Sequence, residues 1–316
     1  MSRILYFCPD FPQPSGGVKT LYRHVARLAE LGFTAVIVHQ KRGFRTTWHN
    51  YDVPMLWLED RPPIRSDDVC VFPEVMADTV RQTQQIAAKR VVFALSWLPT
   101  YNRLRPGERW SDLGVTAVLA KSPTVKRYLE WSMDASVTLI PEYVAPERYF
   151  VQPDVKQAQI AYTTRKDNSG EWLQQILTRK GEPFTSFQWL ALRNFDEENY
   201  AHHLRHSVIY LPTTMQEAMH VSLLEAMACG CLVVGYAGIG GHDYLVAEGP
   251  AQNCILVENG NLPELGLKLE EVIRTWSTQP QAFAPIITHA VSTAKRYQDP
   301  TAERETLREF YSKLTG

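Results

Sequence analysis

One stretch, TTMQEAMHVSLLEAMACGCLVVGYAGIGGHDYL at Thr213–Leu245, carries the clearest structural signal in the chain. It contains two glutamates, Glu217 and Glu225, and the Leu, Ala and Met residues around the second glutamate favour a helix. The apolar run CLVVGYA follows, and then a Gly-Gly pair. Such apolar runs are typical of buried parallel strands. The stretch therefore predicts a loop with a carboxylate, a helix with a second carboxylate, and a buried strand.

A similar alternation begins at the N-terminus. Ile4–Cys8 reads as a buried strand, and a Pro-rich loop follows that ends at Gly16 and Gly17. The next segment predicts a helix that stops at Gly32, before the apolar run FTAVIVHQ. The apolar face of this helix is formed by Leu21, Val25, Leu28 and Leu31. Strand, glycine loop, helix and strand together predict a parallel βαβ unit.

The alternation continues to the C-terminal part of the chain. Further strands are predicted at DDVCVFPE, RVVFALSW, GVTAVLAKS, VTLIPEYV, QIAYTTRK, FQWLAL and SVIYLPTT. Further helices are predicted at Ala77–Lys89, Ser122–Trp131, Gly170–Arg179 and Glu197–His206. Prolines and polar residues interrupt the pattern at Ala145–Gln157, which we interpret as an interdomain linker. The chain thus predicts two doubly wound α/β domains, residues 1–148 and 149–295.

Composition excludes several classes of protein. The 316 residues are 45% hydrophobic, enough for two cores, and 33 Lys and Arg against 34 Asp and Glu leave no charge excess for nucleic acid or acidic lipid. The apolar run at the N-terminus is too short for a signal peptide or a membrane span, so no integral membrane segment is expected. Scattered cysteines favour buried thiols in a cytoplasmic protein, although the C-x-C pair is open to a metal interpretation. The cysteines are Cys8, Cys70, Cys229, Cys231 and Cys254.

Two loops are expected to carry the binding site. Ligands of open α/β sheets bind beyond the carboxyl ends of the strands, where helix N-termini point. Gly16 and Gly17 and the Glu217–Ser222 loop occupy matching positions, each after a strand and each opening a helix. Glycine lets the backbone approach a ligand, and free helix N–H groups suit phosphate. The alternative for the glycine pair is a plain turn.

The Thr213–Leu245 stretch resembles the signature of the retaining, nucleotide-sugar-dependent glycosyltransferases with the GT-B fold, the family 4-like group. That signature reads E-G-F-G-L-x-x-L-E-A-M-A-x-G-x-P-V-V followed by G-G-x-x-E, and Glu217 and Glu225 keep its E-x7-E spacing. The segments SGGVKTLYRHVARLAELGFTAVIV and LIPEYVAPERYF are similar to the family's N-terminal glycine loop and the end of its first domain. The resemblance implies two Rossmann-like domains facing a cleft, with the acceptor on 1–148, the donor on 149–295, and a last helix, 296–316, packing back on the first domain.

The resemblance also implies roles that suit the chemistry of these residues. Glu225, one turn into its helix, would bind the paired hydroxyls of a ribose, and Glu217 would face the sugar and phosphates. The N–H groups near His220, Val221 and Ser222 would bind the diphosphate with help from the helix dipole. The alternative is a solvated loop carboxylate and an amphipathic helix capped by Ser222.

Countercharge for the diphosphate is expected from Arg165 and Lys166, which end the first strand of the second domain where the family carries a basic pair. Charges solvated at a strand end are the alternative.

The chain has no D-x-D pair, so we expect no catalytic metal and no cofactor. His202, His203 and His206 are interpreted as a helix face rather than a zinc site.

Some positions depart from the family pattern. Glu-Ala-Met-His replaces E-G-F-G, Trp97 stands where the family often has a histidine, and Asp243 replaces a glutamate. The implied reaction moves a hexose from a nucleoside-diphosphate sugar to an acceptor hydroxyl with retention, without a protein nucleophile. The acceptor stays open among a saccharide, a lipid-linked glycan, a protein and a modified nucleic acid. The alternatives are a nucleotide-sugar-binding protein with little or no turnover, and a sugar-nucleotide epimerase.

Overall fold

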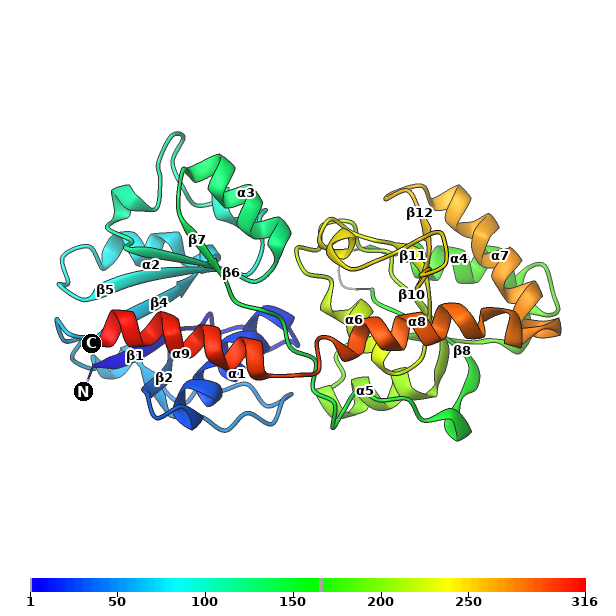
Figure 1. The fold of residues 1–316 in the computed structure, drawn as a ribbon, viewed down its shortest axis with the longest axis horizontal. Coiled ribbons are helices and arrows are strands. Elements are labelled where there is room, and N and C mark those ends of the chain that lie inside the picture. The colour runs from blue at the N-terminus through cyan, green and yellow to red at the C-terminus, as the bar shows by residue number, and fades with distance from the viewer. Residues whose placement is uncertain (1, 165–166) are drawn as a thin grey trace. The chain divides into compact units, whose positions relative to one another are not determined.

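The computed structural model describes residues 2–164 and 167–316. The chain divides into two compact units (Figure 1). The first unit comprises Met1–Glu142 and Pro300–Gly316, and the second comprises Tyr143–Asp299. No helix in the described ranges is long and apolar enough to cross a membrane.

The described part of the first unit contains a seven-stranded parallel sheet with the order β3-β2-β1-β4-β5-β6-β7. The strands are β1 (Arg3–Phe7), β2 (Thr34–His39), β3 (Met55–Trp57), β4 (Val69–Pro73), β5 (Lys89–Ala94), β6 (Ala117–Ala120) and β7 (Val137–Leu139). The helices are α1 (Gly16–Glu30), α2 (Ala77–Gln82), α3 (Pro123–Met133) and α9 (Thr301–Thr315). Short 3₁₀ helices lie at Leu58–Asp60, Glu74–Met76, Pro99–Tyr101 and Ser111–Leu113.

Helices α1 and α9 cover the β1–β2 region of the first sheet. The apolar face predicted for α1 is buried, and Gly32 ends the helix with φ of 86°, a conformation that glycine adopts without strain. Helix α9 runs beside α1 (Figure 1) and buries Leu307 and Tyr311 in the same core. The Tyr311 hydroxyl lies 2.7 Å from that of Tyr6 on β1. The expected packing of the last helix on the first unit is therefore observed.

The described part of the second unit contains a five-stranded parallel sheet with the order β12-β11-β10-β8-β9. The strands are β8 (Gln157–Tyr162), β9 (Gln188–Ala191), β10 (Ser207–Leu211), β11 (Leu232–Tyr236) and β12 (Ile255–Val257). The helices are α4 (Ser169–Thr178), α5 (Glu197–His206), α6 (Val221–Ala228), α7 (Leu262–Thr278) and α8 (Ala284–Lys295). Short 3₁₀ helices lie at Pro153–Val155, Phe184–Ser186, Gly240–Asp243 and Pro280–Phe283.

Two apolar layers enclose the second sheet. One core joins residues of α5, α6 and α8 to the sheet, and another joins residues of α4 and α7 to its strands. A parallel sheet covered on both faces explains why its strands read as continuous apolar runs. Both units therefore have the predicted α/β architecture with doubly wound parallel sheets.

The boundary between the units differs from the expected one. The chain leaves the first unit after Glu142 rather than at residue 148, and returns at Pro300 rather than at residue 296. Tyr143, Val144 and Tyr149 are buried in the core of the second unit, so the start of the predicted linker is packed structure. The helix predicted at Ala77–Lys89 ends at Gln82, because Lys89 begins β5.

Candidate functional site

The candidate site lies where β10 and β11 end in the second unit. The β10–α6 loop, residues 212–220, carries Glu217, and the β11 loop, residues 237–241, carries three glycines. The Gly240 amide donates to the Glu217 carbonyl at 2.8 Å. A Cβ atom on Gly240 would lie 1.9 Å from the Ala218 carbonyl oxygen. The two loops pack backbone against backbone, which only glycine at position 240 permits.

The Glu-Ala-Met-His segment is anchored in the core. Ala218 is 3% exposed and Met219 is 6% exposed, and Met219 packs among the apolar residues of α6. Burial of these two side chains holds the segment without glycine. The glycines that allow close backbone approach stand on the facing loop instead, at positions 238, 240 and 241.

His220 is the residue that joins this loop to α6. It is buried, and its Nδ1 lies 3.2 Å from the Ala237 carbonyl oxygen. Its own carbonyl accepts a hydrogen bond from the Tyr244 hydroxyl at 2.7 Å. With a proton on Nδ1, His220 donates this hydrogen bond to the Ala237 carbonyl.

Helix α6 begins directly after this histidine. His220 is its N-cap, so the interpretation of Ser222 as the cap is wrong. Val221 and Ser222 are half-buried residues of the first turn, which contains no acidic side chain. The N–H groups of a first turn have no acceptor within the helix, and the dipole favours negative charge there. The start of α6 can therefore bind an anion.

The two glutamates occupy different environments. Glu217 is half-buried in the loop, and Glu225, one turn into α6, is only 6% exposed. Burial raises the pKa of Tyr149 well above its usual value, and the negative charge of nearby Glu225 raises it further. The structure thus presents Glu217 at the loop and holds Glu225 against buried tyrosine in the core.

Asn259 is a residue of this site that the sequence interpretation missed. It follows β12, and its side-chain amide exchanges two hydrogen bonds of 3.2 Å with the backbone of Gly238. The loops after β10, β11 and β12 are thereby linked. The Asn259-Gly260 pair marks a turn in the sequence, but nothing local indicates that its side chain supports a distant loop.

Gly16 and Gly17 belong to the first unit, where they are the first residues of α1 rather than the end of a loop. A Cβ atom on Gly17 would lie 3.1 Å from Leu95 Cδ1, whereas one on Gly16 would meet no described atom within 4 Å beyond its chain neighbours and its own helix backbone. Both glycines follow β1 as Val221 follows β10, so the predicted correspondence of the two helix starts is present.

The rim of the first unit also contains a buried carboxyl group that the sequence analysis missed. Glu74 is 2% exposed and accepts hydrogen bonds of 2.9 Å from the Leu95 and Ser96 amides. Burial raises the pKa of Glu74 to about 7, although these amides and the nearby Lys121 favour the charged form. Glu74 therefore fixes the segment that carries Trp97.

Arg165 and Lys166, the expected basic pair, lie outside the described residues. Gly170, which follows them at the start of α4, is packed closely against the ring of Tyr162, because a Cβ atom there would lie 2.1 Å from that ring. Asp243 is half-buried in the 3₁₀ helix after the β11 loop.

Within residues 2–164 and 167–316, no group of three His, Cys, Asp or Glu side chains is arranged to hold a metal ion. Cys229 and Cys231 are buried free thiols. The rings of His202 and His206 on α5 are tilted to one another with centroids 4.0 Å apart, and His206 Nδ1 contacts the His202 carbonyl. These histidines form a helix face, as predicted.

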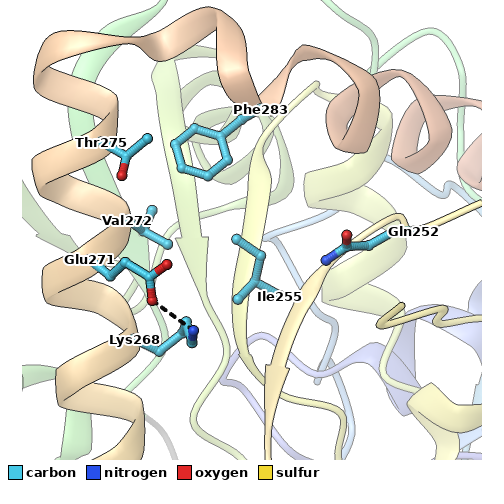
Figure 2. Close-up of a pocket in the computed structure, with 7 residues that line it drawn as sticks. All are labelled: Gln252, Ile255, Lys268, Glu271, Val272, Thr275 and Phe283. Carbon is cyan, nitrogen blue, oxygen red and sulfur yellow. Dashed lines mark hydrogen bonds and ion pairs between the residues drawn. The ribbon is translucent and has the colours of Figure 1, made fainter. Parts of the chain in front are cut away.

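Figure 2 shows a cavity of about 240 Å³ elsewhere in the second unit, between α7 and β12. Its lining includes the ion pair of Lys268 and Glu271, whose charged atoms lie 2.7 Å apart. The residues that line it are Gln252, Ile255, Lys268, Glu271, Val272, Thr275 and Phe283. None of them belongs to the β10–α6 loop or the β11 loop, so this cavity is separate from the candidate site.

Residues 153–275, most of the second unit, match the family described as Glycosyl transferases group 1. A curated relative is an alpha-1,6-glucosyltransferase of Actinobacillus pleuropneumoniae serotype 7 (strain AP76), 24% identical over 251 residues that cover 74% of this chain and 72% of the relative.

Solved structures show the same fold. HepE of Anabaena in complex with UDP and glucose has a TM-score of 0.74 at 15% identity, with 99% of this chain and 100% of HepE covered. Sucrose-phosphate synthase of Thermosynechococcus elongatus has a TM-score of 0.71 at 12% identity, with 99% of each chain covered. The pneumococcal O-GlcNAc transferase GtfA in complex with UDP and GlcNAc has a TM-score of 0.71 at 8% identity, with 99% and 98% covered. The chain has the GT-B fold, and the findings together support a nucleotide-sugar glycosyltransferase.

Proposed function

We propose that this chain transfers a hexose from a nucleoside-diphosphate sugar to an acceptor hydroxyl, with retention of the anomeric configuration and without a metal ion. The observation that carries the proposal is the packing of the β10–α6 loop on the β11 loop. The segment held by this contact contains Glu217 and His220 and leads into the first turn of α6.

The start of α6 would bind the diphosphate. The N–H groups of Val221 and Ser222 belong to the first turn of α6, and the helix dipole favours an anion at this end of the helix. A charge-assisted hydrogen bond contributes about 1.5–3 kcal/mol, and the contribution grows as charge develops on the leaving group. Arg165 and Lys166, which follow β8 in the sequence, would add cationic charge in place of a metal.

The two glutamates would bind different parts of the donor. Glu217, half-buried in the loop, would accept hydrogen bonds from hydroxyls of the transferred sugar. Glu225, almost fully buried beside Tyr149, would bind the ribose diol through its carboxylate. His220, at the N-cap of α6, would contact the transferred sugar.

Retention would follow from attack by the acceptor on the face that the diphosphate leaves. None of these residues needs to form a covalent intermediate. The protein would hold the two substrates in reactive geometry and stabilise the departing diphosphate. Gly16 and Gly17, at the corresponding helix start of the first unit, would let backbone approach a substrate closely.

UDP-glucose is the donor to test first, because the alpha-1,6-glucosyltransferase relative and the HepE complex both involve glucose. The protein is incubated with UDP-glucose and a mixture of sugar acceptors, with excess EDTA and without it. The proposal expects a glucoside with the α configuration by NMR and equal rates in both samples. A product with the β configuration would refute retention, and a rate lost in EDTA and restored by Mg²⁺ or Mn²⁺ would refute metal independence.

The same incubation separates the two other activities. An epimerase converts the free donor sugar when no acceptor is present, and chromatography of the donor detects that product. A binding protein without turnover leaves UDP-glucose unchanged while calorimetry still reports UDP binding. Either outcome would refute the proposed transfer.

A further inference from the structure

Four aromatic side chains of the first unit form one cluster, in which Tyr128 contacts each of the other three. Trp97 contacts Tyr128 with ring centroids 5.9 Å apart, and Tyr128 contacts Trp131 at 6.0 Å. Tyr101 lies 5.9 Å from Tyr128 as well. We call Trp97, Tyr101, Tyr128 and Trp131 the aromatic track.

The aromatic track begins at the carboxyl edge of the first sheet. Trp97 follows β5 directly, on the segment that Glu74 holds through two backbone amides. Tyr128 and Trp131 lie one turn apart on α3, which begins at the end of β6. Ligands of parallel sheets bind at this edge. The track therefore extends from the ligand-binding edge of the first unit along the surface of α3.

Two members of the track are exposed, whereas Trp97 and Tyr128 are half-buried. Trp131 is 81% exposed, more than any other large hydrophobic side chain among the described residues, and Tyr101 is 38% exposed. Leu98, which follows Trp97 in the sequence, is 39% exposed. A cluster of exposed aromatic residues marks a binding surface, because leaving such rings in water forgoes the free energy of burial.

Charged side chains of both signs lie near the track, and several of them form ion pairs. Lys126 pairs with Glu130 one turn away on α3. Arg103 lies 3.5 Å from Asp78. Arg109 lies 4.0 Å from Asp134 at the end of α3. A polyanion such as nucleic acid or an acidic lipid surface requires unmatched cations, which these pairs do not supply.

A neutral saccharide chain fits these features. Tyr and Trp present an apolar ring face together with a polar group, which suits the apolar C–H face and the hydroxyl edge of a pyranose. Successive ring contacts allow successive sugar residues to be held. We propose that the aromatic track binds the non-reacting part of a neutral saccharide acceptor. This inference rests on the proposed glycosyl transfer and names the class of its acceptor.

The test measures transfer from UDP-glucose to α-1,6-linked gluco-oligosaccharides of increasing length, from glucose to the hexamer. In Trp131→Ala the KM for the tetramer to hexamer should rise about tenfold, as expected for the loss of one stacked ring. The KM for glucose and the kcat for all acceptors should stay within twofold of the wild type. Trp131→Phe should restore most of the length dependence.

The matched control is Leu267→Ala, which removes another exposed hydrophobic side chain, 64% exposed on α7. This variant should leave every KM unchanged. A Trp131→Ala variant whose KM values match those of the wild type at all lengths would overturn the proposal, as would an equal rise for glucose and hexamer.

Direct binding keeps the inference separate from the proposed activity. Titration of the protein with the glucose hexamer, without donor, should shift the fluorescence of the wild type and not that of Trp131→Ala. Hexamer binding without any transfer would refute the proposed function and support the track. Transfer to glucose without hexamer binding would overturn the track alone. Trp131-dependent binding of phosphatidylglycerol vesicles or of single-stranded DNA, with no hexamer binding, would overturn the saccharide assignment.

Discussion

Both units contain a doubly wound parallel sheet, but the contacts beyond the carboxyl ends of the strands differ between them. In the second unit, the β10–α6 loop and the β11 loop meet through backbone groups, and the close contact depends on Gly240. In the first unit, buried charged side chains from distant parts of the sequence meet instead, as in the contact of Arg23 with Glu303. The comparison teaches that a short motif can shape the edge of one sheet, while the edge of the other depends on the whole domain.

The charged group of the first unit is centred on Arg23 of α1. Its guanidinium lies 2.7 Å from Glu142, at the last position before the chain enters the second unit, and 2.8 Å from Glu303 on α9. Lys121, after β6, lies 2.9 Å from the second oxygen of Glu142. Although burial alone would raise it, Arg23 and His24 hold the pKa of Glu303 below its usual range. This network, Arg23, Glu142, Glu303 and Lys121, joins segments across nearly the whole chain.

The largest expected effect comes from breaking that network. Arg23→Met leaves Glu142 and Glu303 buried without their main countercharge, and should lower the free energy of unfolding by about 3–5 kcal/mol. Denaturant unfolding measures the loss. The exposed pair of Arg42 and Asp60 supplies the control, since Arg42→Met should cost less than about 1 kcal/mol. The UDP affinity of folded Arg23→Met should stay within twofold of the wild-type value. A loss of UDP binding in this variant would show that the two units do not depend on separate groups of residues.

Glu74 should make the stability of the first unit depend on pH. Its pKa is raised from 4.5 to about 7 in the folded state, so the unfolded chain releases the proton first as the pH rises. The free energy of unfolding should fall by about 3 kcal/mol between pH 4.5 and 7.5 relative to Glu74→Gln, which cannot ionise. Unfolding of both proteins across this range gives the difference. A constant difference would show that the pKa of Glu74 is the same in the folded and the unfolded chain.

In the second unit the sensitive position should be a glycine. Gly240→Ala forces the Ala218 carbonyl away and displaces the start of α6, so transfer and UDP binding should fall about a hundredfold. Gly266→Ala is the control, because its new Cβ would meet only the end of the Leu173 side chain, at 3.2 Å. Calorimetry with UDP and steady-state rates measure both variants. A Gly240→Ala protein that binds UDP normally would show that the backbone contact between these loops is dispensable.

The smallest effects should separate the two glutamates. Glu225→Ala should weaken UDP binding about tenfold, since one charge-assisted contact is lost, while Glu217→Gln should lower kcat more than affinity. The exposed Glu248→Gln should change neither quantity. Similar losses of binding in both glutamate variants would indicate that Glu217 contacts the nucleotide rather than the transferred sugar.

Much of the candidate site in the second unit could be predicted because its information is local. Glu217, His220, Val221 and Ser222 fall in the predicted loop and at the predicted helix start. The roles of these residues and of Glu225 stay predictions. The sequence did not reveal that Glu225 is almost fully buried, because helical periodicity gives the direction of a side chain but not what packs over it.

The sequence by itself determined the alternation of strands and helices. Helix α5 begins and ends at the predicted residues, Glu197–His206, because its N-cap, apolar spacing and following strand are all local signals. The stop at Gly32 is local for the same reason. The short strands β3 and β12 were missed, because three residues carry too little periodicity to be recognised.

Tertiary structure decided which distant residues meet. The unit boundary at Glu142 depends on Tyr143 and Tyr149 finding a core made largely by residues after 160. Arg23 and Glu303 are separated by 280 positions, and the aromatic track joins a loop after β5 to a helix after β6. Local spacing cannot report such contacts, because the burial that determines the energy of a charge or an aromatic ring exists only once the chain has folded.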